Sequence, residues 1–312
     1  MPVGRRAFRH QLLRWFDRNR RQLPWHADRD PYHVWLSEVM LQQTRVPVVV
    51  ERYPAFLTRF PDLKRLAAAK IAEVLVAWSG LGYYRRARAL HATAREVVKR
   101  GGFPQTAEEL AGLPGIGRYT AAAIASIAFG QPCAVVDGNV ERVLGRLLRV
   151  RGEQVWSVAG ELLSPRRPGD FNQAMMELGA TVCLPQAPLC NRCPVFAWCR
   201  TRGAGAARRR SCRRKKPIAY RLAVRDHAVF LVRREDHKSL MPGMWELPQT
   251  RTDAGAPTLR LRHAITNTDY QVSVYGAKTA NGSAGRWVGL AEVERLPLTG
   301  LTQKILRRSN LI

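Results

Sequence analysis

The sequence predicts a mainly α-helical domain followed by a small α+β domain. Before about residue 202, apolar residues recur at the spacing of amphipathic helices. After residue 217, short runs rich in β-branched and aromatic residues alternate with turns such as Asn281-Gly282. Between them, segment 200–216 contains nine Lys or Arg residues and no acidic residue, which is typical of a solvated linker that can also contact phosphate. We therefore predict domains at residues 1–202 and 218–312, joined by a basic linker at 203–217.

The charge of the chain indicates a polyanionic partner. Its 312 residues carry a formal net charge of +27, from 51 Lys and Arg against 24 Asp and Glu. Nucleic acid is the first expectation and an anionic membrane surface the second. No apolar run is long enough to span a bilayer, and the basic residues 1–10 lack the apolar core of a signal peptide. We expect a cytoplasmic protein.

Start signals for helices recur along the first domain. Asp30 followed by Pro31 is typical of a helix start, and Thr106 with Glu109 has capping-box spacing. Helices are expected at residues 8–19, 31–45, 46–59, 62–79, 84–100, 106–110, 119–129 and 171–182, and after Asp137. In the second domain, strands are expected at 222–224, 228–232, 270–275 and 286–288, and a helix at 299–308.

A glycine turn, Leu113-Pro114-Gly115-Ile116-Gly117, separates two of the expected helices. Such a turn at a helix start directs backbone N–H groups outward, where they bind anions. Together with the short helix before it, the turn predicts a helix-hairpin-helix that contacts phosphate. An ordinary turn between two helices is the alternative for so short a pattern.

Asp137 follows the apolar run 134–136 and precedes a helix with Val140, Leu144 and Leu147 at helical spacing. We expect it to cap that helix, and capping alone would explain an Asp there. The N–H donors and the helix dipole also favour the ionised form of a capping carboxylate. An anion fixed close to nucleic acid repels phosphate, so it suggests a further role.

Glu38 lies inside the helix expected at 31–45, with Val34, Trp35 and Leu41 one turn away. Such apolar surroundings raise the pKa of a glutamate. Trp35, Glu38 and Gln42 share one helical stripe and would offer a ring, an acid and an amide to an unstacked nucleobase. A surface glutamate on the polar side of the helix is the alternative.

A second glycine turn at residues 80–86 carries Tyr83, Tyr84 and two arginines. Such a turn can press a ring into a base stack while the guanidinium groups hold phosphate. The alternative is that the tyrosines pack this turn onto the core.

Glu38 and Asp137 together form a pair of carboxylates in contrasting environments, which is typical of an acid and a stabilising anion. In glycosidic chemistry the acid protonates the leaving group, and the anion stabilises the positive charge on the sugar. A purine offers ring nitrogens that Glu38 could protonate. The pair therefore predicts a DNA glycosylase that acts on a flipped base.

Four of the six cysteines cluster as Cys183, Cys190, Cys193 and Cys199, with the spacing C-x6-C-x2-C-x5-C. In an intracellular protein this clustering favours a metal site over disulfides. The spacing leaves zinc and an iron–sulfur cluster both open. The other two cysteines lie outside the pattern.

Several segments together resemble the MutY adenine DNA glycosylases of the helix-hairpin-helix superfamily. They are WLSEVMLQQT at 35–44, GLGYY at 80–84, LPGIGRYT at 113–120 and AVVDGNV at 134–140, with the cysteine spacing. The resemblance covers nearly the whole chain and implies a bilobal helical domain, a [4Fe–4S] cluster on the four cysteines and a Nudix-like C-terminal domain. It also implies that a monomer associated with the nucleoid excises adenine mispaired with 8-oxoguanine or guanine in double-stranded DNA.

The resemblance further implies roles for individual residues. Glu38 matches the acid that protonates adenine, and Asp137 matches the carboxylate that stabilises the oxocarbenium-like sugar. Tyr119 and Asn139 match the neighbours that position these groups. The remaining matches are Arg21, Trp25 and Glu177 at the adenine pocket, Gln43 and Tyr83 entering the base stack beside the lesion, and Leu113, Gly115, Gly117 and Arg118 in the hairpin that grips the strand.

Tyr119 separates subclasses within this superfamily. Enzymes that also nick the strand keep a Lys at this position to form a Schiff base with the sugar, and a phenol cannot form one. We therefore predict a monofunctional glycosylase in which water attacks the sugar. A thymine mismatch glycosylase of the same superfamily and a non-catalytic Fe–S DNA-binding protein are the alternatives.

The C-terminal domain departs from the family pattern. The glutamate-rich box of active Nudix hydrolases is missing from the sequence, so pyrophosphate cleavage is not expected. We predict lesion recognition by His263, Ile265, Thr266 and Asn267, although many members have Phe-Ser-His where this chain has the last three. Ile265 cannot stack as an aromatic ring would, so the preference for 8-oxoguanine is expected to be weaker or built differently. His26 stands where some members carry Arg.

Overall fold

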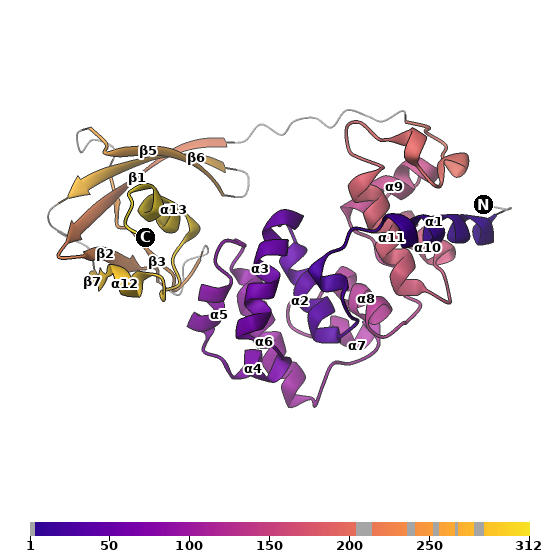
Figure 1. Cartoon of the computed structure of the whole chain (residues 1–312), viewed down its shortest axis with the longest axis horizontal. Coiled ribbons are helices and arrows are strands. Elements are labelled where there is room, and N and C mark those ends of the chain that lie inside the picture. The colour runs from indigo at the N-terminus through magenta and orange to yellow at the C-terminus, as the bar shows by residue number, and fades with distance from the viewer. Residues whose placement is uncertain (1–3, 204–213, 236–240, 252–255, 266–267, 278–283) are drawn as a thin grey trace. The chain divides into compact units, whose positions relative to one another are not determined.

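The computed structural model describes residues 4–203, 214–235, 241–251, 256–265, 268–277 and 284–312 (Figure 1). The chain divides into two compact units. The first consists of Met1–Ala68 and Ala89–Arg209, and the second of Ala69–Arg88 and Arg210–Ile312. The second unit therefore combines the C-terminal part of the chain with a segment from the helical part, which includes the glycine turn at 80–86.

The first unit is helical, as predicted. Asp30 caps α2 by accepting hydrogen bonds from the backbone N–H groups of Tyr32 and His33, and Pro31 occupies the first helical position. Thr106 caps α7 in the same way. The helices are α1 (Arg5–Asn19), α2 (Pro31–Leu41), α3 (Val46–Arg59), α4 (Leu63–Ala68), α6 (Arg85–Lys99, whose first turn belongs to the second unit), α7 (Ala107–Ala111), α8 (Arg118–Ile127), α9 (Gly138–Leu148), α10 (Glu153–Leu162) and α11 (Pro168–Thr181).

Two helix predictions were wrong in extent. The second helix ends at Leu41 rather than near residue 45, because Gln43 adopts a left-handed φ of 56°. The helix expected at 62–79 is divided into α4 and α5 (Ile71–Ala77). Lys70 between them has extended backbone, and its N–H donates to the Glu73 carboxylate at 2.9 Å, so a new helix starts there.

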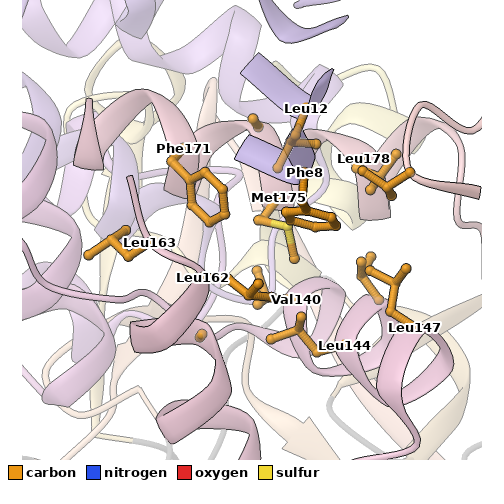
Figure 2. Close-up of a cluster of buried hydrophobic side chains, with 14 of the residues drawn as sticks. Phe8, Leu12, Val140, Leu144, Leu147, Leu162, Leu163, Phe171, Met175 and Leu178 are labelled. Atoms are coloured by element: carbon orange, nitrogen blue, oxygen red, sulfur yellow. The ribbon is translucent and has the colours of Figure 1, made fainter. Parts of the chain in front are cut away.

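Helices α1, α9, α10 and α11 surround one apolar core, in which Phe8, Leu144 and Met175 are 3% exposed or less (Figure 2). Two glycines of α11 let this helix approach α8 and α9 closely. A Cβ on Gly169 would lie 2.6 Å from the carbonyl oxygen of Ser126 in α8, and one on Gly179 would lie 2.6 Å from the Cβ of Asn139 in α9. Side chains from α8, the start of α9 and α11 can therefore meet in one cavity.

Among the described residues, the second unit forms a mixed sheet of seven strands in the order β3-β2-β1-β6-β5, with β4 beside β1 and β7 beside β2. β1 runs parallel to β6, with Tyr220 opposite Val274, and the other described pairs are antiparallel. The strands are β1 (Arg214–Arg225), β2 (Ala228–Arg233), β3 (Trp245–Glu246), β4 (Gln249–Thr250), β5 (Leu259–Ile265), β6 (Thr268–Ala277) and β7 (Gly285–Gly289).

β1 is much longer than the strand expected at 222–224 and begins inside the segment predicted as linker. Its first four residues are exposed. This part of the strand therefore lacks the alternation of apolar and polar residues by which a strand is recognised in a sequence.

Two helices complete the second unit, α12 (Leu290–Val293) and α13 (Gly300–Arg308). Leu301, Ile305 and Leu306 of α13 share an apolar core with β1, β2, β6 and β7, and α13 lies among these strands (Figure 1). The predicted order of a helical domain and then a smaller α+β region is thus confirmed. None of the described helices is both long and apolar enough to cross a membrane.

Candidate active site

A cavity of about 760 Å³ lies in the first unit, between α2, α8, α11 and the turn that precedes α9. This volume is in the range of small-molecule sites. Segments far apart in the sequence contribute to its wall, so tertiary packing alone brings them together. Ten of the residues predicted to be functional line it: Arg21, Trp25, Glu38, Gln43, Gly117, Arg118, Tyr119, Asp137, Asn139 and Glu177.

Glu38 extends into this cavity from the middle of α2 and is only 7% exposed. The Tyr119 hydroxyl lies 2.6 Å from Oε2 of Glu38 and donates to it. Burial raises the pKa of Glu38 to about 7; the hydrogen bond from Tyr119 opposes this increase, and the charge of Asp137 adds to it. The surface alternative for Glu38 is therefore excluded.

The aromatic partner expected beside Glu38 is a core residue instead. Trp35 is 1% exposed, contacts the ring of Phe103 at 5.4 Å between centroids, and does not line the cavity. α2 is buried on every side from Val34 to Met40, so residues of one helical stripe can face different surroundings there. Gln42 does line the cavity, and its Nε2 donates to Thr120 at 3.2 Å.

Asp137 caps α9, as predicted. Its Oδ1 accepts from the backbone N–H groups of Asn139 and Val140 at 2.9 and 2.7 Å. Its Oδ2 accepts from Nδ2 of Asn139 at 2.8 Å. Donors therefore hold both oxygens, so the carboxylate is fixed at the cavity wall.

Asn172 on α11 holds the segment before Asp137 and was not predicted. Its Nδ2 donates to the carbonyl of Cys133 at 2.8 Å and to the hydroxyl of Ser126 at 2.9 Å, and its Oδ1 accepts from the N–H of Val135 at 3.2 Å. The residue is 3% exposed. A polar residue between the buried Phe171 and Ala174 was the available sequence signal.

Arg21 and Glu177 form a bidentate ion pair at the cavity wall. Nε and Nη2 of Arg21 each lie 2.7 Å from a different carboxylate oxygen of Glu177, which is 5% exposed. Trp25 is buried beside them, and Nδ1 of His26 lies 3.2 Å from the carbonyl of Arg21. Burial lowers the pKa of His26.

Arg142 connects α9 with α11 and the cysteine loop and was also missed. It donates to Oδ1 of Asn139 at 2.8 Å, to the carbonyl of Gly179 at 2.7 Å and to the carbonyl of Cys183 at 2.9 Å. One turn later, Arg146 donates to the carbonyl of Leu184 at 2.6 Å and lies 3.4 Å from Sγ of Cys183. The sequence shows that Arg142 and Arg146 are one turn apart on the same helix, but it does not show their partners, which lie about 40 residues further along the chain.

The four clustered cysteines line one small cavity of about 30 Å³, beside Arg146 and Leu178. Burial, together with the other three thiols, raises the pKa of Cys193 to about 11. Within the described part of the chain, no three His, Cys, Asp or Glu residues converge on a point that would hold a single metal ion. The four thiols are therefore neighbours around a shared cavity.

The glycine hairpin joins α7 to α8, as predicted. Gly115 has a φ of 75°, and a Cβ there would lie 2.7 Å from the Cβ of Ala89, so this position requires glycine. Leu113 is buried beneath the turn, whereas Gly115 and Gly117 are exposed. Arg118 begins α8, with its guanidinium 3.8 Å from the ring of Trp156 and 3.0 Å from the Glu153 carboxylate.

The other described residues that were predicted to contact DNA or the lesion do not line this cavity. Tyr83 belongs to the second unit, where it is 42% exposed with a left-handed φ of 46°. His263 and Ile265 are half-buried on β5, and burial lowers the pKa of His263. Thr266 and Asn267 lie outside the described residues.

Residues 36–164 match the model of the HhH-GPD superfamily of base excision DNA repair proteins. The chain is 52% identical over 215 residues to the adenine DNA glycosylase of Homo sapiens, covering 63% of this chain and 39% of that protein. It is 36% identical over 308 residues to the adenine DNA glycosylase of Arabidopsis thaliana, covering 81% and 49%. A solved thermostable thymine-DNA glycosylase superposes with a TM-score of 0.60 at 29% identity, covering 64% of this chain and 96% of that one.

In its helical fold, its hairpin and these matches, the chain is similar to the HhH-GPD superfamily. The chain spans between 39% and 49% of the length of the two curated relatives above. Both of these relatives are adenine DNA glycosylases.

Proposed function

We propose that this protein is an adenine DNA glycosylase of base excision repair, which hydrolyses the N-glycosidic bond of adenine mispaired with 8-oxoguanine or guanine. The arrangement of Glu38 carries the proposal: a buried carboxyl with a pKa near 7 shares a cavity with the ionisable Asp137. Such a carboxyl retains its proton in a large fraction of molecules at neutral pH, so it can act as an acid.

In the proposed reaction, Glu38 donates its proton to a ring nitrogen of the flipped adenine. The glycosidic electron pair leaves with the base, and the anomeric carbon becomes cationic. Asp137, held by the Asn139 and Val140 donors, stabilises this cation electrostatically. Water then attacks the anomeric carbon, and its proton returns to the Glu38 carboxylate.

Tyr119 supports hydrolysis without strand cleavage. Its hydroxyl is committed to Glu38 at 2.6 Å, and a phenol cannot form the Schiff base that a lyase needs. We therefore propose a monofunctional glycosylase. The Arg21–Glu177 pair and Trp25 form the wall that would hold the flipped base.

For the cysteine loop we propose a [4Fe–4S] cluster bound by Cys183, Cys190, Cys193 and Cys199. Four thiols around one cavity suit a cluster in which each cysteine binds a different iron. A tetrahedral zinc site would instead require all four sulfurs around one ion. The bound cluster would supply a rigid scaffold for the loop, whose Arg192 and Arg200 would contact DNA phosphate.

Double-stranded DNA is the proposed partner, and the exposed hairpin at Gly115 and Gly117 would bind one backbone phosphate. The decisive experiment is a panel of duplexes with A·8-oxoguanine, A·G or T·G mispairs, assayed for free base and abasic product. Adenine release without strand nicking is expected. Release of thymine alone would overturn the proposal in favour of a thymine glycosylase, the activity named for the superposed structure. Iron and sulfide analysis of the purified protein separates a cluster from zinc.

A further inference from the structure

Tyr83 is held in an unusual backbone conformation within the second unit. Its φ of 46° follows two left-handed glycines, Gly80 at 88° and Gly82 at 68°. A left-handed conformation is unfavourable for a non-glycine residue, so neighbouring contacts must maintain it. The ring is nevertheless 42% exposed, which leaves it available to a base stack.

Arg86 supplies such contacts from the first turn of α6. Its guanidinium carbon lies 5.4 Å from the centroid of the Tyr83 ring and also 5.4 Å from that of Trp78. Its Nη2 donates to the carbonyls of Leu81 at 2.9 Å and of Gly82 at 3.2 Å. The same side chain therefore contacts the ring of Tyr83 and the backbone that leads to it.

Trp78 completes this arrangement. It is fully buried, and its Nε1 donates to the carbonyl of Gly82 at 3.0 Å. Burial lowers the pKa of Arg86 to about 10, so the group is largely withdrawn from solvent yet charged at neutral pH. A planar guanidinium can stack and donate in two directions at once, which an ammonium cannot do. Arg85, the preceding residue, is exposed.

We propose that Arg86 is a positioning residue, which holds Tyr83 in the orientation needed to enter the base stack at a mispair. Arg86 thus acts through Tyr83 rather than by holding phosphate. The proposal rests on the proposed function, because it assigns Tyr83 a task during mispair recognition.

The test is a double-mutant cycle of Arg86→Gln and Tyr83→Ala. Single-turnover excision with enzyme in excess gives a rate that does not depend on the folded fraction. Arg86→Gln should slow excision from A·8-oxoguanine by about tenfold, which is within the usual range of pairwise coupling. In the Tyr83→Ala background the same substitution should change the rate less than twofold. Equal losses in both backgrounds would overturn the proposal.

Two further variants separate positioning from charge. Arg86→Lys keeps the charge without the planar group and should lose as much activity as Arg86→Gln; full rescue by Lys would contradict the proposal. Arg85→Gln should weaken binding to mispaired and fully paired duplexes by the same factor, whereas Arg86→Gln should weaken binding to the mispaired duplex more. If the wild-type protein releases no adenine, the proposed function fails, and the binding comparison still decides the role of Arg86.

Discussion

Glu38 and Asp137 line the same cavity, but their environments are opposite. Glu38 extends from the middle of a helix that is buried on every side, and its carboxyl accepts a hydrogen bond from Tyr119. Asp137 lies at a helix N-terminus, where two backbone N–H groups and the Asn139 amide donate to its oxygens. Two carboxyl groups of similar chemistry therefore have different surroundings: burial raises the pKa of Glu38, whereas hydrogen-bond donors fix the position of the Asp137 carboxyl group.

This difference predicts that replacing each carboxyl group by its amide has different effects on the excision rate and on stability. Glu38→Gln removes the transferable proton and should lower the single-turnover excision rate at least about 1,000-fold, within the range for general acid catalysis. Binding to the mispaired duplex should remain nearly unchanged, because Gln keeps the shape of the side chain. Electrophoretic or anisotropy titrations check the binding. An excision rate within tenfold of wild type would remove Glu38 from its proposed role.

The raised pKa of Glu38 also predicts an effect on stability. The folded protein retains the Glu38 proton up to about pH 7, whereas the unfolded chain releases it near pH 4.5. Raising the pH between these values therefore favours unfolding, by about 3 kcal/mol in total. The Gln variant carries no such proton, so relative to wild type it should gain stability from pH 5 to pH 8. Denaturant unfolding at several pH values checks this, and parallel curves for the two proteins would contradict it.

Asp137→Asn should preserve the fold and reduce the chemistry. Asn is as good an N-cap as Asp, so the free energy of unfolding should change by less than about 1 kcal/mol. The loss of negative charge should lower the excision rate by about 100-fold. Asp30→Asn is the matched control, because it makes the same change at the cap of α2, away from the cavity. A comparable loss in the control would show that capping, not charge, is responsible.

The position of Asp137 should also depend on Asn172. Asn172→Leu leaves the buried carbonyl of Cys133 and the N–H of Val135 without their partner, which should cost about 3 kcal/mol of unfolding free energy. The remaining folded protein should excise adenine about tenfold more slowly, because the segment before Asp137 is less constrained. Asn19→Leu, at the exposed end of α1, is the control. An unchanged rate in Asn172→Leu would show that the cap alone positions Asp137.

The sequence predicted the features that depend on local pattern. Asp137 and Asp30 were recognised as caps because the capped N–H groups lie two or three residues away. The glycine hairpin was also predicted correctly, because its turn is defined by residues adjacent in sequence. The predicted burial of Glu38 was confirmed, although Trp35, which shares its helical stripe, is a core residue.

Features that depend on distant partners were missed. Asn172 bonds residues 37 and 46 positions away, and Arg142 reaches Cys183 across 41 positions. No local period marks such bonds, because tertiary packing creates them. β5 was missed for a different reason: its alternation of half-buried and exposed residues was present in the sequence, but arginines occupy the exposed positions and conceal a strand in so basic a chain.

The smallest expected effect concerns Tyr119, whose hydroxyl donates to the Glu38 carboxyl group. Tyr119→Phe keeps the apolar surroundings and removes a hydrogen bond that stabilises the ionised carboxylate, so the pKa of Glu38 should rise above about 7. Excision requires protonated Glu38, so the limb of the pH–rate profile that falls with rising pH should move to higher pH. The rate at low pH should change only by a few-fold. Tyr32→Phe removes a buried phenol whose hydroxyl donates to Phe60 instead, and its profile should match wild type. A shift to lower pH in Tyr119→Phe would mean that Tyr119 stabilises the protonated acid, which would reverse the electrostatic role assigned to this pair.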